Sequence, residues 1–179
     1  MSLTLKTDLS SFDRLMSTMT LDVEAAARPA AQAGAEVFYK QVKLNVAGLG
    51  RVTGNLDSAI YQAYSANNSG KGRAVYHVSW NAKKAPHGHL VEFGHIQRYK
   101  VFTGKDGHWY TAIRPGMKGK KAPSRKAPQA VKDAYYIPLD APRQVAAQPF
   151  VRPALAVAPQ AAEASEKALR AYLRKTWLI

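Results

Sequence analysis

The first third of the chain has apolar and small residues at helical spacing. Between Asp22 and Val46 they recur at steps of three and four residues, at Val23, Ala26, Ala27, Ala30, Ala33, Val37, Gln41 and Leu44. This pattern predicts a long amphipathic helix, bent or restarted at Pro29, because proline lacks an amide and its ring disturbs the hydrogen-bond ladder. A preceding helix is predicted after the candidate N-caps Asp8, Ser10 and Ser11. The many small side chains predict close packing against a sheet or another helix.

Further along, the pattern changes to alternation. Residues 60–64 and 74–80 alternate between apolar and polar positions, and the sequence between them, NNSGKG, is rich in turn-forming residues. A β-hairpin from about 60 to 80 is therefore predicted. A second hairpin is predicted where residues 98–102 and 108–113 flank the turn 103–107.

The C-terminal segment returns to helical spacing. Glu163 with Lys167 and Glu166 with Arg170 are i,i+4 pairs in the favourable order. Leu169, Tyr172 and Leu173 supply the predicted buried stripe. Together these patterns predict an α+β fold in one domain, residues 1–179. A small antiparallel β-sheet would be packed by the long N-terminal helix and the C-terminal helix, with a long basic loop inserted.

The inserted loop, residues 114–132, reads RPGMKGKKAPSRKAPQAVK and is called the basic loop below. It has almost nothing apolar to bury, so it is predicted to be mobile in the isolated protein and to order against a partner. Residues 71–132 carry net +12 of the total +14, and such a segment attracts polyanions or an acidic protein surface. The residues predicted to contact a partner or DNA are Lys118, Lys120, Lys121, Arg125, Lys126 and Lys132.

The chain contains no cysteine, which excludes disulfides, thiolate metal sites and a cysteine nucleophile. The N-terminal residues lack the basic and apolar regions of a signal peptide. No apolar run approaches the roughly 20 residues that span a bilayer. We therefore expect a protein made in a cytoplasm, with no membrane partner.

The segment HGHLVEFGH places His87, His89, Glu92 and His95 close together, and imidazole and carboxylate are common metal ligands. However, the five histidines fall in predicted strands or turns and match no recognised ligand pattern. The chain also lacks a phosphate-binding loop and a serine-nucleophile elbow. We expect structural histidines, no catalytic residue, no metal, no cofactor and no enzymatic activity.

A nucleic-acid-binding protein is the alternative function. Aromatic residues accompany the charges of residues 71–132, and bases stack on such rings. The competing interpretation is that these rings face inward as sheet core. They are Tyr76, Trp80, Tyr99, Phe102, Trp109 and Tyr110.

Three blocks, in this order, resemble a known family. The first is TGNLDSAI, with Thr53, Gly54 and Leu56; the second is LVEFGH, with Glu92, Phe93 and Gly94. The third is AQPFVRPAL, with Pro149, Phe150, Arg152 and Pro153. They are similar to segments of the neck or tail-completion proteins of long-tailed bacteriophages and prophages. The resemblance covers roughly residues 1–95 and 146–179. His95 departs from the usual threonine, and the basic region between about 96 and 146 is an extension.

The resemblance implies that these blocks are scaffold and that the histidines bind no metal. It implies that Phe93 points to the core, that Glu92 pairs locally, and that Gly94 adopts a conformation that a Cβ would forbid.

In function, the resemblance implies a structural, non-enzymatic virion component at the head–tail junction, present in the host cytoplasm during assembly. Its implied partners are further copies in a ring, with six copies expected, and the tail terminator, tail tube and head–tail connector proteins. DNA in the channel is a further candidate partner.

Overall fold

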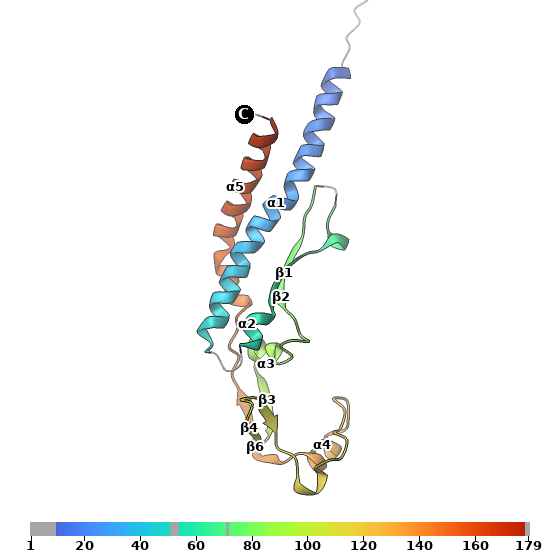
Figure 1. Ribbon diagram of the computed structural model, residues 1–179, viewed down its shortest axis with the longest axis vertical. Coiled ribbons are helices and arrows are strands. Elements are labelled where there is room, and N and C mark those ends of the chain that lie inside the picture. The colour runs from blue at the N-terminus through green and yellow to red at the C-terminus, as the bar shows by residue number, and fades with distance from the viewer. Residues whose placement is uncertain (1–9, 51–53, 71, 178–179) are drawn as a thin grey trace, which may run out of the picture. The chain divides into compact units, whose positions relative to one another are not determined.

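The computed structural model describes the backbone of residues 10–50, 54–70 and 72–177, and the side chains of residues 17–176 within these ranges. Helices and short antiparallel strands follow one another along the chain (Figure 1), which confirms the predicted α+β class. The described residues form two compact units. The first contains those up to Asn45, Ile60–Trp80 and those from Val151 onward; the second contains Val46–Ala59 and Asn81–Phe150. The single domain expected for residues 1–179 stays a prediction.

The long helix α1 spans Ser10–Gly48 and continues through Pro29. The predicted separate first helix and the restart at Pro29 are therefore wrong. Positions four residues apart form one row, which is buried at Ala26, Ala30, Gly34, Val42 and Val46 and half-buried at Phe38. Val23 and Leu44, predicted on the buried face, are 50% and 65% exposed. The row of buried positions is thus narrower than the sequence pattern predicted.

In the first unit, α1 packs closely against the C-terminal helix α5, Ala158–Trp177 (Figure 1). A Cβ on Gly34 would collide with the Ser165 hydroxyl and lie 3.1 Å from the carbonyl oxygen of Ala161. The small residues of α1 therefore allow the approach of another helix, as predicted. On α5, Leu169, Tyr172 and Leu173 are half-buried. Glu166 forms the predicted ion pair with Arg170 at 2.5 Å.

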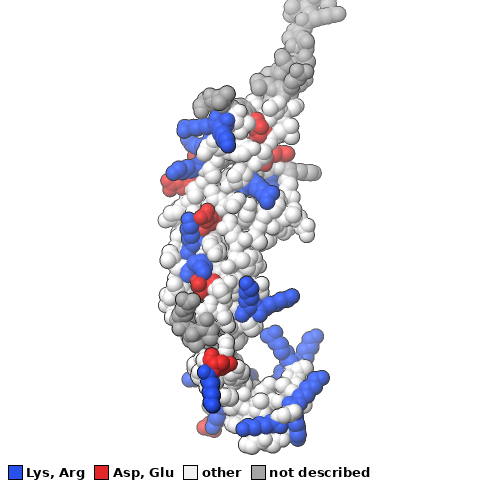
Figure 2. Space-filling model, viewed as in Figure 1, with Lys and Arg blue, Asp and Glu red and all other residues white. Residues whose placement is uncertain are grey.

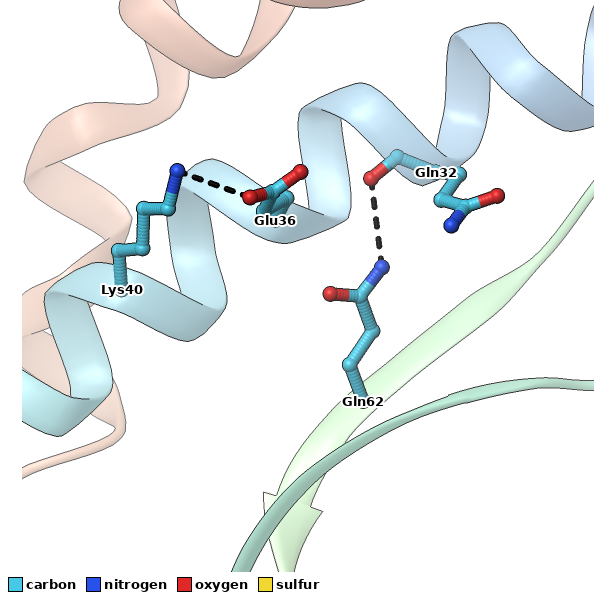
Figure 3. Close-up of polar contacts among 4 residues, drawn as sticks. All are labelled: Gln32, Glu36, Lys40 and Gln62. Atoms are coloured by element: carbon cyan, nitrogen blue, oxygen red, sulfur yellow. Dashed lines mark hydrogen bonds and ion pairs between the residues drawn. The ribbon is translucent and has the colours of Figure 1, made fainter.

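Strands β1, Ile60–Tyr64, and β2, Tyr76–Trp80, form the predicted hairpin. A 3-10 turn, η1, at Ala66–Asn68 lies between them. The Gln62 side-chain amide donates to the carbonyl oxygen of Gln32 on α1 at 3.2 Å, one turn from the Glu36–Lys40 ion pair (Figure 3). The hairpin thus packs along α1.

The second unit begins with the short helix α2, Asn55–Ala59, and continues with α3, Gly88–Phe93. Strand β3, His95–Tyr99, pairs antiparallel with β6, Pro138–Val145. The sequence did not predict β6, because two prolines interrupt its pattern. Each of these strands has a single neighbour among the described residues, and an edge strand tolerates proline on its unpaired side.

The second predicted hairpin is present but shorter, with β4, Val101–Thr103, paired to β5, Trp109–Thr111. Arg98 and Tyr99, predicted within it, belong to β3 instead. The described strands therefore form three separate two-stranded sheets rather than the one predicted sheet.

The basic loop has more local structure than its composition predicts. It contains a 3-10 turn, η2, at Pro115–Met117, and it ends in helix α4, Gln129–Tyr135. Lys132 is therefore helical. The hydroxyl of the buried Tyr135 donates to the Lys120 carbonyl at 2.8 Å. The amide of Arg114 donates to the Tyr135 carbonyl at 3.0 Å, so both ends of the loop are attached to α4.

Candidate functional site

Most of the segment that contains His87, His89 and His95 is helical rather than extended. Helix α3 occupies Gly88–Phe93, and His87 already has helical angles at φ −80° and ψ −10°. The prediction that the histidines lie in strands or turns is wrong for His89, which lies inside the helix. In a helix, residues two positions apart point in different directions. The extended H-x-H arrangement considered for His87 and His89 therefore does not form.

The other histidines of the chain lie on other elements: His95 begins β3, His77 is on β2 and His108 precedes β5. Over the part of the chain that the structure describes, no group of three His, Cys, Asp or Glu side chains is placed to hold a metal ion. Burial lowers the pKa of His87, and the nearby His89 lowers it further. These effects favour a neutral imidazole at His87.

Glu92 is a buried charged residue of the second unit, with 1% of its surface exposed. Its carboxylate oxygen Oε2 accepts a hydrogen bond from the backbone amide of Phe150 at 2.7 Å, and Phe150 is fully buried. The amide of Gln148 donates to the carbonyl of Val91 at 2.8 Å. This hydrogen bond joins Glu92 to the third sequence block, 58 residues away. Pairing of Glu92 within its own segment stays a prediction.

Gly94 directs the chain from α3 into β3. Its φ is +71°, and a Cβ at this position would lie 2.7 Å from the Val145 carbonyl oxygen and 2.8 Å from the Ala147 nitrogen. Both the angle and the contact exclude a side chain. The implied requirement for glycine is confirmed. Because β3 and β6 pair from His95 and Val145 onward, this close approach begins the sheet.

Phe93 is 64% exposed, so the expectation that it points to the core is wrong. Successive residues of an α-helix are about 100° apart around the axis. Burial of Glu92 therefore turns its neighbour Phe93 outward. The buried aromatic residue of the motif blocks is instead Phe150.

One cavity of about 380 Å³ in the second unit is lined by residues of all three blocks. Gly54 and Leu56 come from the first block, Val91 from the second and Gln148 from the third. Gly54 has φ +73° and accepts a hydrogen bond from the Ser58 amide at 3.1 Å, which closes the turn of α2. The blocks thus form one structural junction.

The remaining motif residues are Thr53, Pro149, Arg152 and Pro153. Thr53 lies outside the described residues. Pro149 is half-buried. Arg152 and Pro153 are exposed, and they begin the 3-10 helix η3, Arg152–Val157, in the first unit.

The basic loop presents most of its cationic side chains to solvent. Five of the six predicted contact residues are exposed, namely Lys118, Lys120, Lys121, Arg125 and Lys126. Lys132 is half-buried, and its ammonium donates to the carbonyl oxygen of Arg125 at 2.7 Å. Figure 2 shows blue side chains gathered around the lower end of the view, with little red among them. Because Lys132 is half-buried and bonded within its own unit, we treat it apart from the five exposed cations of the loop.

The carboxylates near the loop have phenolic partners. Asp133 accepts a hydrogen bond of 2.8 Å from the Tyr99 hydroxyl and another from Gln129. Burial raises the pKa of Tyr99, and Asp133 raises it further. Asp106 accepts a hydrogen bond of 2.6 Å from the Tyr110 hydroxyl, and this bond lowers the pKa of the aspartate. Asp133 and Asp106 thus form hydrogen bonds within their own unit.

The aromatic residues of residues 71–132 divide into two groups. Tyr76, Trp80 and Tyr99 are half-buried. In the β4–β5 hairpin, Phe102, Trp109 and Tyr110 are 53%, 64% and 46% exposed, so the sheet-core interpretation is wrong for these three. The sequence contained no signal for this exposure, because the strands predicted at 98–102 and 108–113 are longer than the observed three-residue strands.

Residues 10–94 match the family model described as "Bacteriophage HK97-gp10, putative tail-component". The resemblance to a bacteriophage tail family is thereby confirmed over these residues. The family match suggests that the protein acts in the virion among other phage structural proteins. No curated protein and no solved structure matches the chain.

The third sequence block lies beyond the matched residues, yet Phe150 is bonded to Glu92 within them. Within the described ranges, none of the helices is both long and apolar enough to cross a membrane.

Proposed function

We propose that this tail component is a non-enzymatic structural protein of the neck, which completes the tail and helps join it to the head. It acts as a ring of identical subunits, with six copies expected, between the tail terminator and tail tube on one side and the head–tail connector on the other. The family match for residues 10–94 carries this proposal. The link from Glu92 to the AQPFVRPAL block supports extending it to the C-terminal region.

The exposed surface supports a role as a subunit of an assembly. Large apolar side chains are exposed on both units, including Leu21, Leu44, Leu155, Phe93 and Trp109. Exposed apolar residues that gather in patches are typical of interaction surfaces. Two-stranded sheets are also marginally stable in isolation. Contacts with neighbouring subunits would cover such residues and strands.

The first unit offers an apolar groove of about 220 Å³ for such a contact. It is lined by residues of α1, β2 and η3, among them Phe38, Val78 and Leu155. In a ring, each subunit presents one surface to the neighbour on one side and a different surface to the neighbour on the other. The groove and the exposed β4–β5 hairpin are two different surfaces available for such contacts.

The test is complementation of phage particles that lack the protein. Heads and tails made without it should fail to join, and adding the purified protein should restore joined particles, counted by electron microscopy. Cryo-electron microscopy of joined particles should then show density for the protein at the junction. Normal joining without the protein, or density confined to another part of the virion, would contradict the proposal.

A further inference from the structure

The charged side chains of the basic loop are all cationic, and most of them are exposed to solvent. Between residues 93 and 150 there are eleven Lys and Arg against three Asp and Glu. The loop itself contains no acidic residue. A Cβ placed on Gly116 or Gly119 would meet no atom within 4 Å. The loop therefore stands clear of the rest of its unit at these two positions.

Two of the three acidic residues in this region accept hydrogen bonds from groups of their own unit. Asp133 accepts hydrogen bonds from Tyr99 and Gln129, and Asp106 accepts from Tyr110 and from the His108 amide. The third carboxylate, Asp140, is exposed on β6. Coulomb repulsion among the five exposed cations of the loop is therefore weakly compensated, and an external polyanion would relieve it.

The chemistry of the loop favours nucleic acid over an acidic protein. The centres of protein interfaces are enriched in aromatic residues and depleted of lysine. Residues 114–132 contain no aromatic residue, and their largest apolar side chains are Met117 and Val131. Binding to phosphates requires only cations that can reach them. The absence of rings in the loop also favours a duplex over a single strand, which binds by stacking its bases.

We propose that the basic loop binds the phosphate backbone of duplex DNA without sequence preference. The binding residues are the five exposed cations, Lys118, Lys120, Lys121, Arg125 and Lys126. The hydrogen bonds from Tyr135 to the Lys120 carbonyl and from Lys132 to the Arg125 carbonyl hold the loop that displays them. This activity would be a property of the subunit and does not depend on its position in the neck.

The test measures binding of the purified full chain to a fluorescent 30-base-pair duplex by anisotropy. Each neutralised phosphate contributes about −0.9 to the slope of log K against log salt. Five contacts therefore predict an affinity about 500-fold weaker at 200 mM than at 50 mM NaCl. In the loop-neutral variant, the five exposed cations are replaced by glutamine. Its affinity at 50 mM should fall by at least about 30-fold, and its salt slope should approach zero.

The matched control removes the same amount of charge from exposed positions of α1 and α5. This helix-neutral variant replaces Lys40, Lys167, Arg170, Arg174 and Lys175 by glutamine. It should bind duplex DNA within about threefold of the unmodified protein, because phosphate contacts are local. Equal losses in the two variants would mean that net charge alone drives binding and would overturn the proposal. No binding of the unmodified protein at 50 mM would also overturn it.

Two further probes test the chemical class of the ligand. A single strand of the same length should bind more weakly than the duplex. Poly-glutamate of equal charge should bind more weakly than either DNA. Tighter binding of poly-glutamate would assign the loop to an acidic protein partner, and tighter binding of the single strand would overturn the assignment to a duplex.

Footprinting of the unmodified protein removes any dependence on folding of the variants. Duplex DNA should protect Lys118, Lys120, Lys121 and Lys126 from acetylation, while Lys167 and Lys175 stay reactive. Protection of both groups alike, or of neither, would contradict the proposal. The head–tail joining assay is independent of these measurements, so failure of DNA binding is distinguishable from failure of the proposed neck function.

Discussion

The Glu92 carboxylate and the Phe150 backbone amide are joined by a hydrogen bond of 2.7 Å, although 58 residues separate them in the chain. Both residues are almost completely buried. A buried carboxylate is stabilised by the hydrogen bonds that it accepts, and without them its desolvation is costly. Position 92 therefore holds the third sequence block against the second. The acidic residue in the histidine-rich segment has a structural explanation that needs no metal.

Replacement of Glu92 by alanine should lower the free energy of unfolding by about 2–4 kcal/mol, because the buried Phe150 amide loses its partner and a cavity is left. Glu92→Gln keeps an oxygen acceptor and should cost less, about 1–2 kcal/mol. Urea denaturation of the purified protein would measure both. Glu36→Ala is the control, since Glu36 forms an exposed ion pair with Lys40 (Figure 3), and it should change the stability by less than about 0.5 kcal/mol. Equal effects at positions 92 and 36 would refute the structural role of Glu92.

Gly94→Ala should destabilise the protein by about 2–4 kcal/mol, because a positive φ and a backbone clash act together. The added Cβ would lie 2.7 Å from the Val145 carbonyl oxygen, and a backbone atom cannot move aside as a side chain can. Gly119→Ala provides a matched comparison, since Gly119 has φ +81° with open space around it. That change should cost only about 1 kcal/mol. An equal fall in melting temperature for Gly94→Ala and Gly119→Ala would contradict the prediction, because it would show that the backbone moves to remove the clash at Gly94.

Phe150→Ala should cost about 3–5 kcal/mol of stability, as expected for removing a fully buried ring. Phe93→Ala should cost less than about 1 kcal/mol, because most of that ring is already in solvent. If a neighbouring subunit covers Phe93, the same substitution should reduce head–tail joining while the isolated subunit keeps its melting temperature. A large loss of stability from Phe93→Ala would instead show that the ring is part of the core.

Much of the fold was predictable where the pattern is local. Alternation and turn residues predicted the 60–80 hairpin, and helical spacing predicted the segments of α1 and α5. Strand β6 was not predictable in this way, because Pro138 and Pro142 remove amide donors that a strand ordinarily uses. Its pairing with β3 is a tertiary contact between residues 39 to 50 positions apart in the chain, which no local pattern encodes.

At the junction, the sequence indicated which residues matter but not which of their side chains are buried. The positive φ of Gly94 was predictable from the residue type. Which of Glu92 and Phe93 is buried depends on which side of α3 faces the core, and a helix of six residues is too short for its sequence to show that side. The ordinary preference for a buried phenylalanine therefore gave the wrong answer. The hydrogen bond from Phe150 supplies the polar partner that reverses this preference.

The last prediction concerns the basic loop in the assembled neck. Its five exposed cations lie at the surface of the isolated chain, and exposed charges away from caps and core contribute little to stability. The loop-neutral variant should therefore keep its free energy of unfolding within about 1 kcal/mol of the unmodified protein. Adding Lys132→Gln should cost about 0.5–1.5 kcal/mol more, because the 2.7 Å hydrogen bond to the Arg125 carbonyl is lost.

The same loop-neutral variant should impair the joining of tails to heads, since an oppositely charged partner would otherwise hold the loop in place. The helix-neutral variant, which loses the same charge, should join normally. Thermal melting of the subunit and the complementation assay would measure the two halves of this prediction separately. Normal joining by the loop-neutral variant would show that the loop is dispensable in the neck. A large fall in its melting temperature would show that the loop cations stabilise the fold itself.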